Sequence, residues 1–171
     1  MKKLIFTAMI LLSIPMAVAA QTTGYVNTET ILSEMPEYTQ AQEQLERLKK
    51  QYELQFENEL KVIENLFNQY QSQKAGLNEV QRQARENEII SKERSLKQRE
   101  QEIFGQEGTL ATRSKELLDP IKEIVQTAID KVATERGVLL VFDVATTQGV
   151  IFRDSKADLT PQVMSRLGLI K

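Results

Sequence analysis

Carboxylates are the most abundant side chains in this sequence that could carry out chemistry. Within the segment 37–116 they recur at helical spacing, for example Glu57 with Glu64 and Glu86 with Glu93. A pair of carboxylates can act as general acid and general base when their surroundings separate the two pKa values. Between the apolar positions of this segment, however, most residues are Glu, Gln, Lys, Arg or Asn. We therefore interpret these carboxylates as the solvated face of a helix.

The residues that other catalytic chemistries need are absent from the sequence. The chain contains no histidine, cysteine or tryptophan, which removes the commonest general base and metal ligand together with the thiol nucleophile. The sequence also has no glycine-rich phosphate loop, nucleophile elbow or metal-ligand cluster. We therefore predict that the protein is not an enzyme and has no cofactor and no metal site. Asp143 and Asp158 lie at predicted element boundaries, where they are expected to cap turns or helices.

Three basic residues form a cluster at a predicted turn. Lys74, Arg82 and Arg85 are candidate contacts for anionic lipid headgroups or lipopolysaccharide. The alternative is that they are solubilising surface charges, and the charge density of the segment favours it.

Large aromatic residues are the third candidate group. Each of them, taken alone, is expected to pack between helices. Two helices cannot cover so many large side chains, so part of this apolar surface is expected to stay exposed and to mark a partner site. The candidate binding residues are Tyr52, Phe56, Phe67, Tyr70 and Phe104.

The N-terminus predicts the compartment. Two lysines precede an uncharged apolar run, residues 4–14, which is shorter than the roughly 20 residues that span a bilayer. Pro15 ends the run and small residues follow it, so residues 1–20 are predicted to be a secretory signal peptide. An uncleaved N-terminal anchor is the alternative. A lipid-anchored lipoprotein is excluded because no cysteine follows the run.

The charge of the mature chain argues against nucleic acid as a partner. Cleavage after residue 20 leaves 20 basic and 24 acidic residues, a net charge of −4. A mildly acidic chain has no global electrostatic reason to bind nucleic acid. The absence of cysteine is compatible with an oxidising compartment but provides no disulfide.

The apolar pattern predicts a long antiparallel helical hairpin. Apolar residues occur at 38, 41, 45, 48, 52, 56, 60, 63, 67 and 70, which is a heptad seam whose 3-4 alternation is interrupted by successive steps of four between 48 and 60. A helix over 37–73 would be about 55 Å long. Gly76 then fits a left-handed helix end, and Asn78 with Gln81 fits the cap of a returning helix.

The returning helix has a thinner seam. Ile89, Leu96 and Ile103 recur every seven residues, and the repeat continues to residue 124. A stripe this narrow covers one partner helix but cannot build a broad core. Gly105 and Gly108 fall inside this helix, where each costs about 1 kcal/mol relative to alanine. We interpret them as a soft point, which is either a hinge of the arm or a weak helix without a role.

The two ends of the chain predict a small α+β body. Residues 24–27 are a candidate strand, residues 138–142 a strand buried on both faces, and residues 150–152 a strand that completes a hairpin. The helical pattern is interrupted at Pro120, where a kink is expected before the helix continues to Gly137.

The predicted fold class is therefore α+β, mainly α. Residues 21–36 and 117–171 form a discontinuous body, and residues 37–116 protrude from it as a helical hairpin arm. A body this small with three short strands is marginal by itself. We therefore expect it to be buried against sister subunits.

The order of these features resembles the Skp/OmpH family of periplasmic chaperones for outer-membrane proteins. The resemblance covers residues 24–170 and includes the charged hairpin. The residues that carry it are Gly24-Tyr25-Val26-Asn27, Ile31-Leu32, Pro36-Glu37, Pro120-Ile121, the run 128–133, Gly137, Asp143, Asp158-Leu159-Thr160 and Val163.

The resemblance implies a jellyfish-shaped homotrimer, in which three bodies combine their strands and three arms enclose a cavity. Unfolded outer-membrane β-barrel proteins would be held in this cavity in the periplasm, without ATP. The sequence departs from the family pattern in one respect. Better-known members are strongly basic, whereas this chain is acidic overall, so the resemblance carries less weight for electrostatic client capture and for lipopolysaccharide binding.

Two other classes of function stay open from the sequence. An envelope tether or scaffold protein without chaperone activity would use the hairpin as a rigid spacer, and the glycines at 105 and 108 argue against rigidity. A module for anionic lipid or lipopolysaccharide would bind anionic vesicles in a salt-dependent way.

Overall fold

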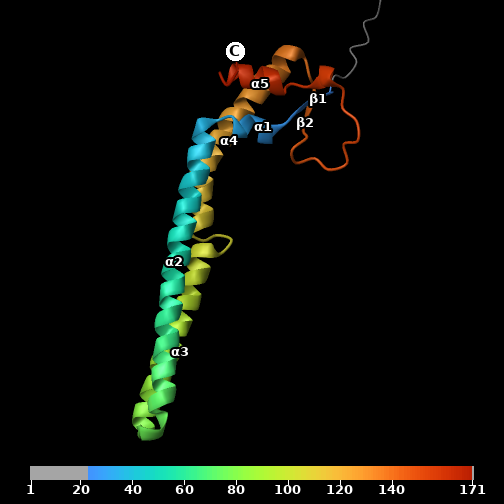
Figure 1. Cartoon of the computed structure of the whole chain (residues 1–171). Helices are drawn as coiled ribbons and strands as arrows, with labels where there is room; N and C mark the ends of the chain where they lie inside the picture. Colours follow the sequence, from blue (N-terminus) through green and yellow to red (C-terminus); the bar gives the residue numbers. More distant parts are fainter. Residues whose placement is uncertain (1–22, 171) are drawn as a thin grey trace, which may run out of the picture.

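The computed structural model describes residues 23–170, which form a small body at one end of a long helical arm (Figure 1). The predicted signal peptide, residues 1–20, lies outside the described residues. The elements are β1 (Thr23–Val26), α1 (Thr28–Ser33), α2 (Pro36–Gln73), a 3-10 turn (Lys74–Gly76), α3 (Glu79–Phe104), α4 (Thr109–Arg136), β2 (Leu140–Asp143), a second 3-10 turn (Ser155–Ala157) and α5 (Thr160–Arg166). The predicted class, α+β and mainly α with a helical hairpin, is confirmed.

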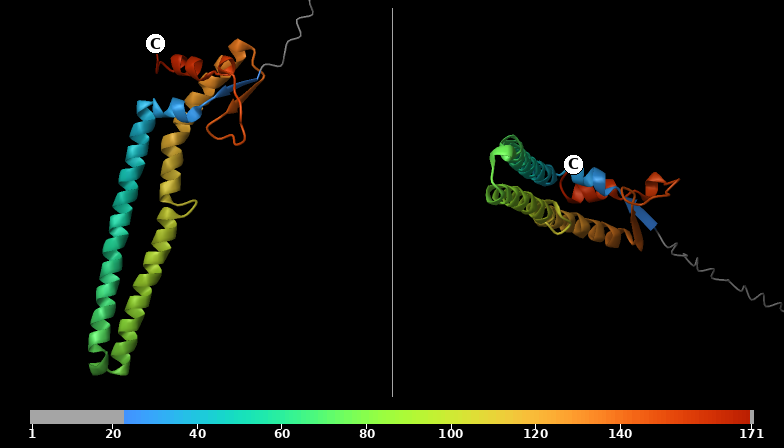
Figure 2. Two further views of the ribbon diagram at one scale, coloured as in Figure 1. Left: turned by 45° about the vertical axis from the view of Figure 1, so that its right-hand side comes forward. Right: turned by 90° about the horizontal axis from the view of Figure 1, so that it is seen from below.

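The arm consists of α2, which runs away from the body, and of α3 with the first part of α4, which return beside it (Figure 2). α2 is uninterrupted because no glycine or proline occurs between residues 37 and 73. Pro36 occupies the first helical turn, where its missing N–H is not needed. The predicted helix over 37–73 is confirmed, and the 38 residues of α2 span about 57 Å.

The reversal at the arm tip is a 3-10 turn followed by a capped helix. The side chain of Asn78 accepts a hydrogen bond from the N–H of Gln81 at 2.9 Å, and the N–H of Asn78 donates to the Gln81 side chain at 3.1 Å. The predicted capping box is therefore present. The prediction of a left-handed Gly76 is wrong, because its φ angle is not positive. Gly76 ends the 3-10 turn and the extended Leu77 completes the reversal.

The returning half of the arm is two helices rather than one. α3 ends at Phe104, α4 begins at Thr109, and residues 105–108 form a loop that projects from the side of the arm (Figure 1). The prediction that Gly105 and Gly108 lie inside a helix is therefore wrong. Two glycines within four residues lower the helix propensity enough for the backbone to leave the helix at this point.

The seam between the helices differs from the predicted one in the distal half of the arm. Leu60 and Phe67 are 56% and 46% exposed, whereas their neighbours Glu59 and Leu66 are half-buried. The least exposed positions of α2 are 38, 41, 45, 48, 52, 56, 59, 63, 66 and 70. The structure therefore has two successive steps of four, from 48 to 56, and regular heptad spacing resumes after Phe56 instead of after Leu60.

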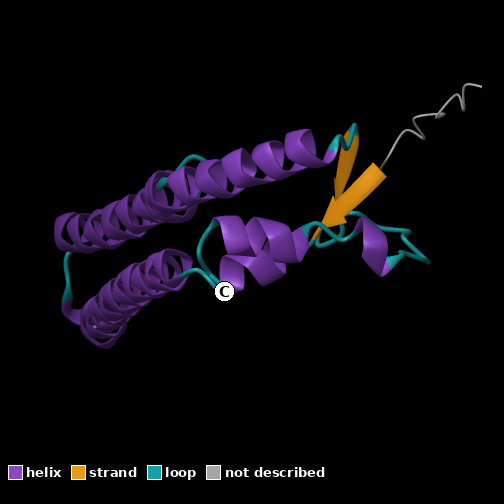
Figure 3. Ribbon diagram, turned by 90° about the horizontal axis from the view of Figure 1, so that it is seen from above, coloured by secondary structure: helices purple, strands orange, loops and turns teal. Residues whose placement is uncertain are grey.

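The body contains one hydrophobic core, to which both ends of the chain contribute. α1, the second part of α4 and α5 pack together with β1 (Figure 3). α4 continues through Pro120 and ends at Gly137, whose φ of 64° is the predicted left-handed cap. The buried core residues are Val26, Ile31, Met35, Ala41, Ile121, Val125, Ala128, Ile129, Val132, Leu159, Val163 and Met164.

β1 and β2 form a two-stranded parallel sheet, in which Thr23 lies opposite Leu140 and Val26 opposite Asp143 (Figure 3). The predicted strand at 24–27 is confirmed, but the predicted hairpin is wrong, because residues 150–152 belong to no strand. β2 is also not buried on both faces, since its residues are exposed or half-buried in the chain described. Parallel strands need a long crossover connection, and the helices α1 to α4 between β1 and β2 provide it.

Two aspartates fix the ends of the body elements. The carboxylate of Asp143 accepts hydrogen bonds from the N–H of Thr28 at 3.2 Å and from its hydroxyl at 2.7 Å, which ties β2 to the start of α1. Asp158 accepts a hydrogen bond from the N–H of Thr160 at 2.8 Å, at the start of α5. Both aspartates therefore cap elements as predicted.

Candidate functional site

The carboxylates of the arm are solvated or paired and do not resemble acid–base catalysts. Lys61 donates a hydrogen bond to Glu57 at 2.7 Å, and this bond lowers the pKa of Glu57. A lowered pKa keeps the carboxylate ionised, which is the opposite of what a general acid requires. Glu86 accepts a hydrogen bond from the hydroxyl of Tyr70. Within residues 23–170, no three His, Cys, Asp or Glu side chains are grouped so that they could hold a metal ion.

An aromatic cluster lies where the loop of residues 105–108 interrupts the arm. The ring of Phe104 lies edge-on to Phe56 and Tyr52, with ring centroids 5.5 and 6.5 Å apart. The guanidinium of Arg99 lies 5.5 Å from the ring centroid of Phe56 and forms an ion pair with Glu59. Edge-to-face rings and a stacked cation each stabilise such a joint. The cluster therefore fastens the end of α3 to α2.

The five predicted binding aromatics divide into two groups. Phe56 and Tyr70 are buried between the helices of the arm. Phe67 and Phe104 are 46% and 38% exposed, and Tyr52 is half-buried. In the single chain, Phe67, Phe104 and part of Tyr52 are accessible to a partner, whereas Phe56 and Tyr70 pack the arm.

Other exposed apolar side chains of the arm escaped the sequence reasoning. Leu60 is a predicted seam residue and Ile90 directly follows the seam residue Ile89, yet each exposes half or more of its surface. Leu54 and Val62 are exposed on α2 as well. The signal that would have found Leu60 is the single shift of the heptad register at Phe56, after which Glu59 takes the inner position.

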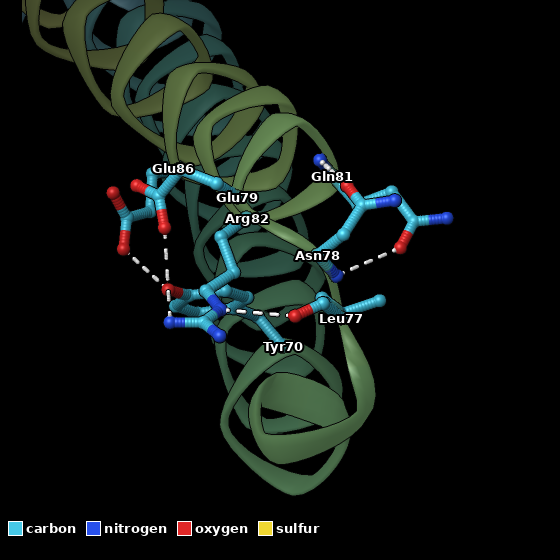
Figure 4. A network of polar contacts seen from close by, with 7 residues as sticks. All are labelled: Tyr70, Leu77, Asn78, Glu79, Gln81, Arg82 and Glu86. Atoms are coloured by element: carbon cyan, nitrogen blue, oxygen red, sulfur yellow. Dashed lines mark hydrogen bonds and ion pairs between the residues drawn. The ribbon is translucent and has the colours of Figure 1, made fainter.

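Local partners hold the basic residues at the arm tip, and Figure 4 shows those of Arg82. The side chain of Arg82 donates to the carbonyl oxygen of Leu77 at 3.1 Å, and its guanidinium lies 3.8 Å from the carboxylate of Glu79. Arg85 pairs with Glu88 at 3.1 Å, and the ammonium of Lys74 lies 5.4 Å from the ring centroid of Tyr70. The three predicted lipid contacts all belong to the arm tip, but neighbouring glutamates compensate the charge of the two arginines.

The same tip holds the tyrosine that closes the seam. The hydroxyl of Tyr70 donates to Glu86, and this bond raises the pKa of Tyr70, with a further contribution from burial (Figure 4). The hydroxyl therefore stays protonated and links α2 to α3 across the physiological pH range. This cross-link and the capping box at Asn78 fix the geometry of the reversal.

The predicted hinge glycines are required by close backbone contacts. A Cβ atom on Gly105 would lie 2.3 Å from the carbonyl oxygen of Gln101, and one on Gly108 would lie 2.8 Å from that of Ile103. Only glycine fits such approaches without a shift of the backbone. The break in the helix is therefore a defined loop in which both glycines are sterically necessary, and its role as a hinge stays a prediction.

The largest exposed apolar surface of the body surrounds β2. Large apolar side chains are exposed on β2 and on the segment that follows it, and Ile151 is fully exposed. The exposed apolar residues of this surface are Leu139, Leu140, Phe142, Val150, Ile151 and Phe152.

None of the helices within residues 23–170 has both the length and the hydropathy that a membrane crossing requires.

A discontinuous α+β body that carries a protruding helical hairpin defines a recognisable class of fold, and comparisons with known proteins place the chain within it. The family described as outer membrane protein (OmpH-like) matches residues 22–167. The chain therefore belongs to the OmpH-like family. A search of curated proteins finds no match.

A solved structure has the same fold. It is the crystal structure of a candidate outer-membrane chaperone, described as OmpH-like, from Caulobacter crescentus CB15. The TM-score is 0.68 at 12% sequence identity, and the alignment covers 87% of this chain and 85% of the other. At this level of identity the likeness concerns the fold alone.

Proposed function

We propose that this protein is an ATP-independent holdase chaperone, which binds unfolded outer-membrane β-barrel proteins and prevents their aggregation. The observation that carries the proposal is the arm, a long helical hairpin with exposed large apolar side chains far from any folded core. Membership of the OmpH-like family supports it, as does the description of the structural neighbour as a candidate chaperone. The proposal assigns no catalytic activity and no cofactor to the chain.

The arm has the physical properties that holding an unfolded chain requires. An unfolded barrel exposes apolar strands with unpaired edges, which aggregate readily. Scattered contacts to side chains such as Phe67 and Phe104 bind such a chain weakly at many points, without one fixed geometry. In this proposal the loop at residues 105–108 allows the outer half of the arm to adapt to clients of different size.

A dilution assay tests the proposal. A urea-unfolded outer-membrane barrel protein is diluted into buffer with or without residues 21–171, and light scattering is followed. We expect suppression of scattering at close to one trimer per client. Replacement of residues 40–114 by a short linker should abolish the suppression while the body stays folded. If the protein does not suppress scattering at any ratio, the holdase proposal fails, and the tether or scaffold alternative, with a single fixed partner, replaces it.

We also propose that three copies assemble through the body. The exposed apolar residues around β2 and at 150–152 support this, because an isolated two-stranded sheet is marginally stable in water. Sedimentation equilibrium tests the stoichiometry. The double variant Leu140→Ser with Ile151→Ser should dissociate the assembly, and a monomeric wild-type protein would refute the trimer.

The proposed compartment is the periplasm. It rests on the signal peptide predicted at residues 1–20 and on the family, and mass spectrometry of the exported protein should locate cleavage near residue 20. Contact of Lys74, Arg82 and Arg85 with anionic lipid or lipopolysaccharide has weaker support, since Glu79 and Glu88 compensate the arginines. Co-sedimentation with anionic vesicles at low and high salt tests this contact.

A further inference from the structure

The outer part of α2 has an apolar face that is broader than the seam. Ile63 and Leu66 lie at seam positions and are half-buried in the arm. Leu60 and Phe67 directly follow seam positions and are 56% and 46% exposed, and Val62 directly precedes one and is 52% exposed. Successive residues of a helix lie about 100° apart around its axis, so these exposed side chains flank the seam on both sides. We call these five residues the distal face of α2.

The opposing stripe of α3 is too narrow to cover the distal face. The buried residues of α3 are Ile89 and Leu96, which are seven residues apart. Ile90 is the one apolar residue between them in the sequence, and it is 50% exposed. An apolar face that is about 100° wide or wider normally packs against a core, whereas a single row of residues covers a narrow strip. α3 therefore covers the middle of the distal face and leaves both of its flanks exposed.

Polar contacts join α3 to α2 on either side of the distal face. Toward the arm tip, the hydroxyl of Tyr70 donates a hydrogen bond to Glu86. Toward the body, Arg99 forms an ion pair with Glu59. The two side chains of this ion pair are 41% and 40% exposed, and ion pairs in contact with water stabilise a structure only slightly. Between these two contacts, the attachment of α3 depends on its thin apolar stripe.

α3 can separate from α2 while the rest of the fold stays in place. The turn at 74–78 and the loop at 105–108 bound α3, and neither continues its helix (Figure 2). α2 is anchored independently, because Ala41 belongs to the body core. α4 is anchored by the five buried residues of its body half. Among the core residues of the described chain, none comes from α3, so α3 is the long helix whose release costs least.

The exposed flanks are too small to hold a second copy of the chain stably. The exposed parts of Leu60, Val62 and Phe67 offer on the order of 250 Å², whereas a stable interface needs about 800 Å² from each partner. An unfolded apolar segment needs no such preformed area, because it adapts its shape and gains contacts one by one. Its contact area grows further if it takes the place of α3 on Ile63 and Leu66.

We propose that α3 is a displaceable cover, and that an unfolded apolar segment displaces it and binds to the distal face of α2. The inference rests on the proposed holdase function and adds where the segment binds and how the site is protected when it is empty. In the empty protein, α3 shields Ile63 and Leu66 and so reduces the apolar surface that could cause association. A bound segment covers these residues together with Leu60 and Phe67.

A reducible cross-link tests the inference, because the chain contains no cysteine of its own. The double variant Glu59→Cys with Arg99→Cys, in residues 21–171, is joined by a bismaleimide reagent that has a disulfide in its spacer, which ties α3 to α2. Binding of a dye-labelled peptide in which leucine alternates with serine is measured by fluorescence anisotropy. The linked protein should bind the peptide at least tenfold more weakly, and reduction of the spacer should restore the affinity.

The matched control is a link that does not cross the seam. Glu57 and Lys61 form an ion pair one turn apart on α2. The variant Glu57→Cys with Lys61→Cys therefore carries the same reagent without holding α3, and linking should leave its affinity unchanged. Circular dichroism should show the same helix content before and after each link.

Amide hydrogen exchange gives a second readout, which reports on α3 directly. In the unlinked protein, saturating peptide should accelerate exchange of the amides of residues 79–104 at least tenfold, because a released helix loses its protection. The amides of residues 59–70, which the peptide covers, should exchange no faster than before.

Three results would overturn the inference. The first is equal affinity of the linked and the reduced protein. The second is exchange of α3 that the peptide slows or leaves unchanged, since the peptide would then bind the closed arm. The third is dissociation of the assembly by the variant Leu60→Gln with Phe67→Gln, which would assign the distal face to a second copy of the chain.

The dilution assay separates these failures from failure of the proposed function. If the linked protein suppresses scattering as well as the reduced protein does, the displaceable cover is refuted and the holdase function stands. If the wild-type protein does not suppress scattering at all, the holdase function is refuted together with the cover.

Discussion

Two phenylalanines of α2 allow packing and binding to be separated by the same substitution. Phe56 is 9% exposed, contacts Phe104 edge-on at 5.5 Å and lies under the guanidinium of Arg99. Phe67 is on the same helix but is 46% exposed. Replacement by alanine should therefore destabilise the arm at Phe56 and weaken client holding at Phe67.

The magnitude at Phe56 follows from its surroundings. Truncation of a buried phenylalanine to alanine costs about 3–5 kcal/mol in a domain core. Two helices cover the ring less completely than a core does, so we expect about 3 kcal/mol, a value that includes the lost contacts with Phe104 and Arg99. At Phe67, where little burial is lost, we expect about 0.5 kcal/mol.

Amide hydrogen exchange followed by mass spectrometry measures this effect for the arm alone. A loss of about 3 kcal/mol in opening free energy corresponds to roughly a hundredfold faster exchange in peptides of α2 and α3. Peptides of the body core should be unchanged and serve as the internal control. If Phe67→Ala accelerates exchange as much as Phe56→Ala does, the seam derived above is wrong, and so is the division of the aromatics into packing and binding residues.

Three further predictions concern the ends of the elements. Asn78→Ala removes the capping box and should cost about 1 kcal/mol, seen as several-fold faster exchange confined to the arm tip; an effect that spreads into the body would contradict a local role. Gly137→Ala places a Cβ at a φ of 64° and should lower the free energy of unfolding by about 1 kcal/mol in a urea titration, whereas Gly76→Ala, at an ordinary φ, should change it little. Partial burial raises the pKa of Asp143, but the hydrogen bonds from Thr28, Ala145 and Thr146 outweigh it and leave the pKa below its usual range. A lowered pKa stabilises the fold above the ordinary pKa of about 4 and less as the pH falls below it, so Asp143→Asn should flatten this part of the pH–stability profile; an unchanged profile would refute the assignment.

The features that the sequence predicted well depend on local physical chemistry. The start of α3 follows from Asn78 and Gln81, because a capping box needs only residues three apart. The end of α4 follows from Gly137, because a left-handed cap favours glycine whatever surrounds it. The length of α2 follows from the absence of glycine and proline over 37–73. Such signals act within one or two helical turns, so no knowledge of the tertiary structure was needed.

The features that the sequence predicted poorly depend on tertiary contacts between elements. Leu60 and Glu59 compete for one seam position, and the shift of register at Phe56 decides in favour of the charged residue, whose carboxylate pairs with Arg99 on α3. That partner belongs to another helix, so the local pattern around Leu60 could not reveal the choice. The prediction that residues 105–108 lie inside a helix is wrong for a related reason. A seven-residue apolar repeat continues through it, although the backbone leaves the helix there.

The incorrect hairpin is the most informative of these differences, because the sequence pattern that suggested it is still present in the chain. Residues 150–152 are β-branched and aromatic, as strand residues are, yet in the single chain they join no strand and Ile151 is fully exposed. β2 beside them is paired on one edge with β1 and exposes Leu140 and Phe142. A segment with strand chemistry and a sheet with an unpaired edge are complementary, but the fold of one chain does not bring them into register. We infer that strand pairing is completed between copies of the body, so amides of residues 150–152 should exchange slowly in the assembly and fast in the Leu140→Ser, Ile151→Ser variant. Fast exchange in both would mean that the assembly, if it forms, uses another surface.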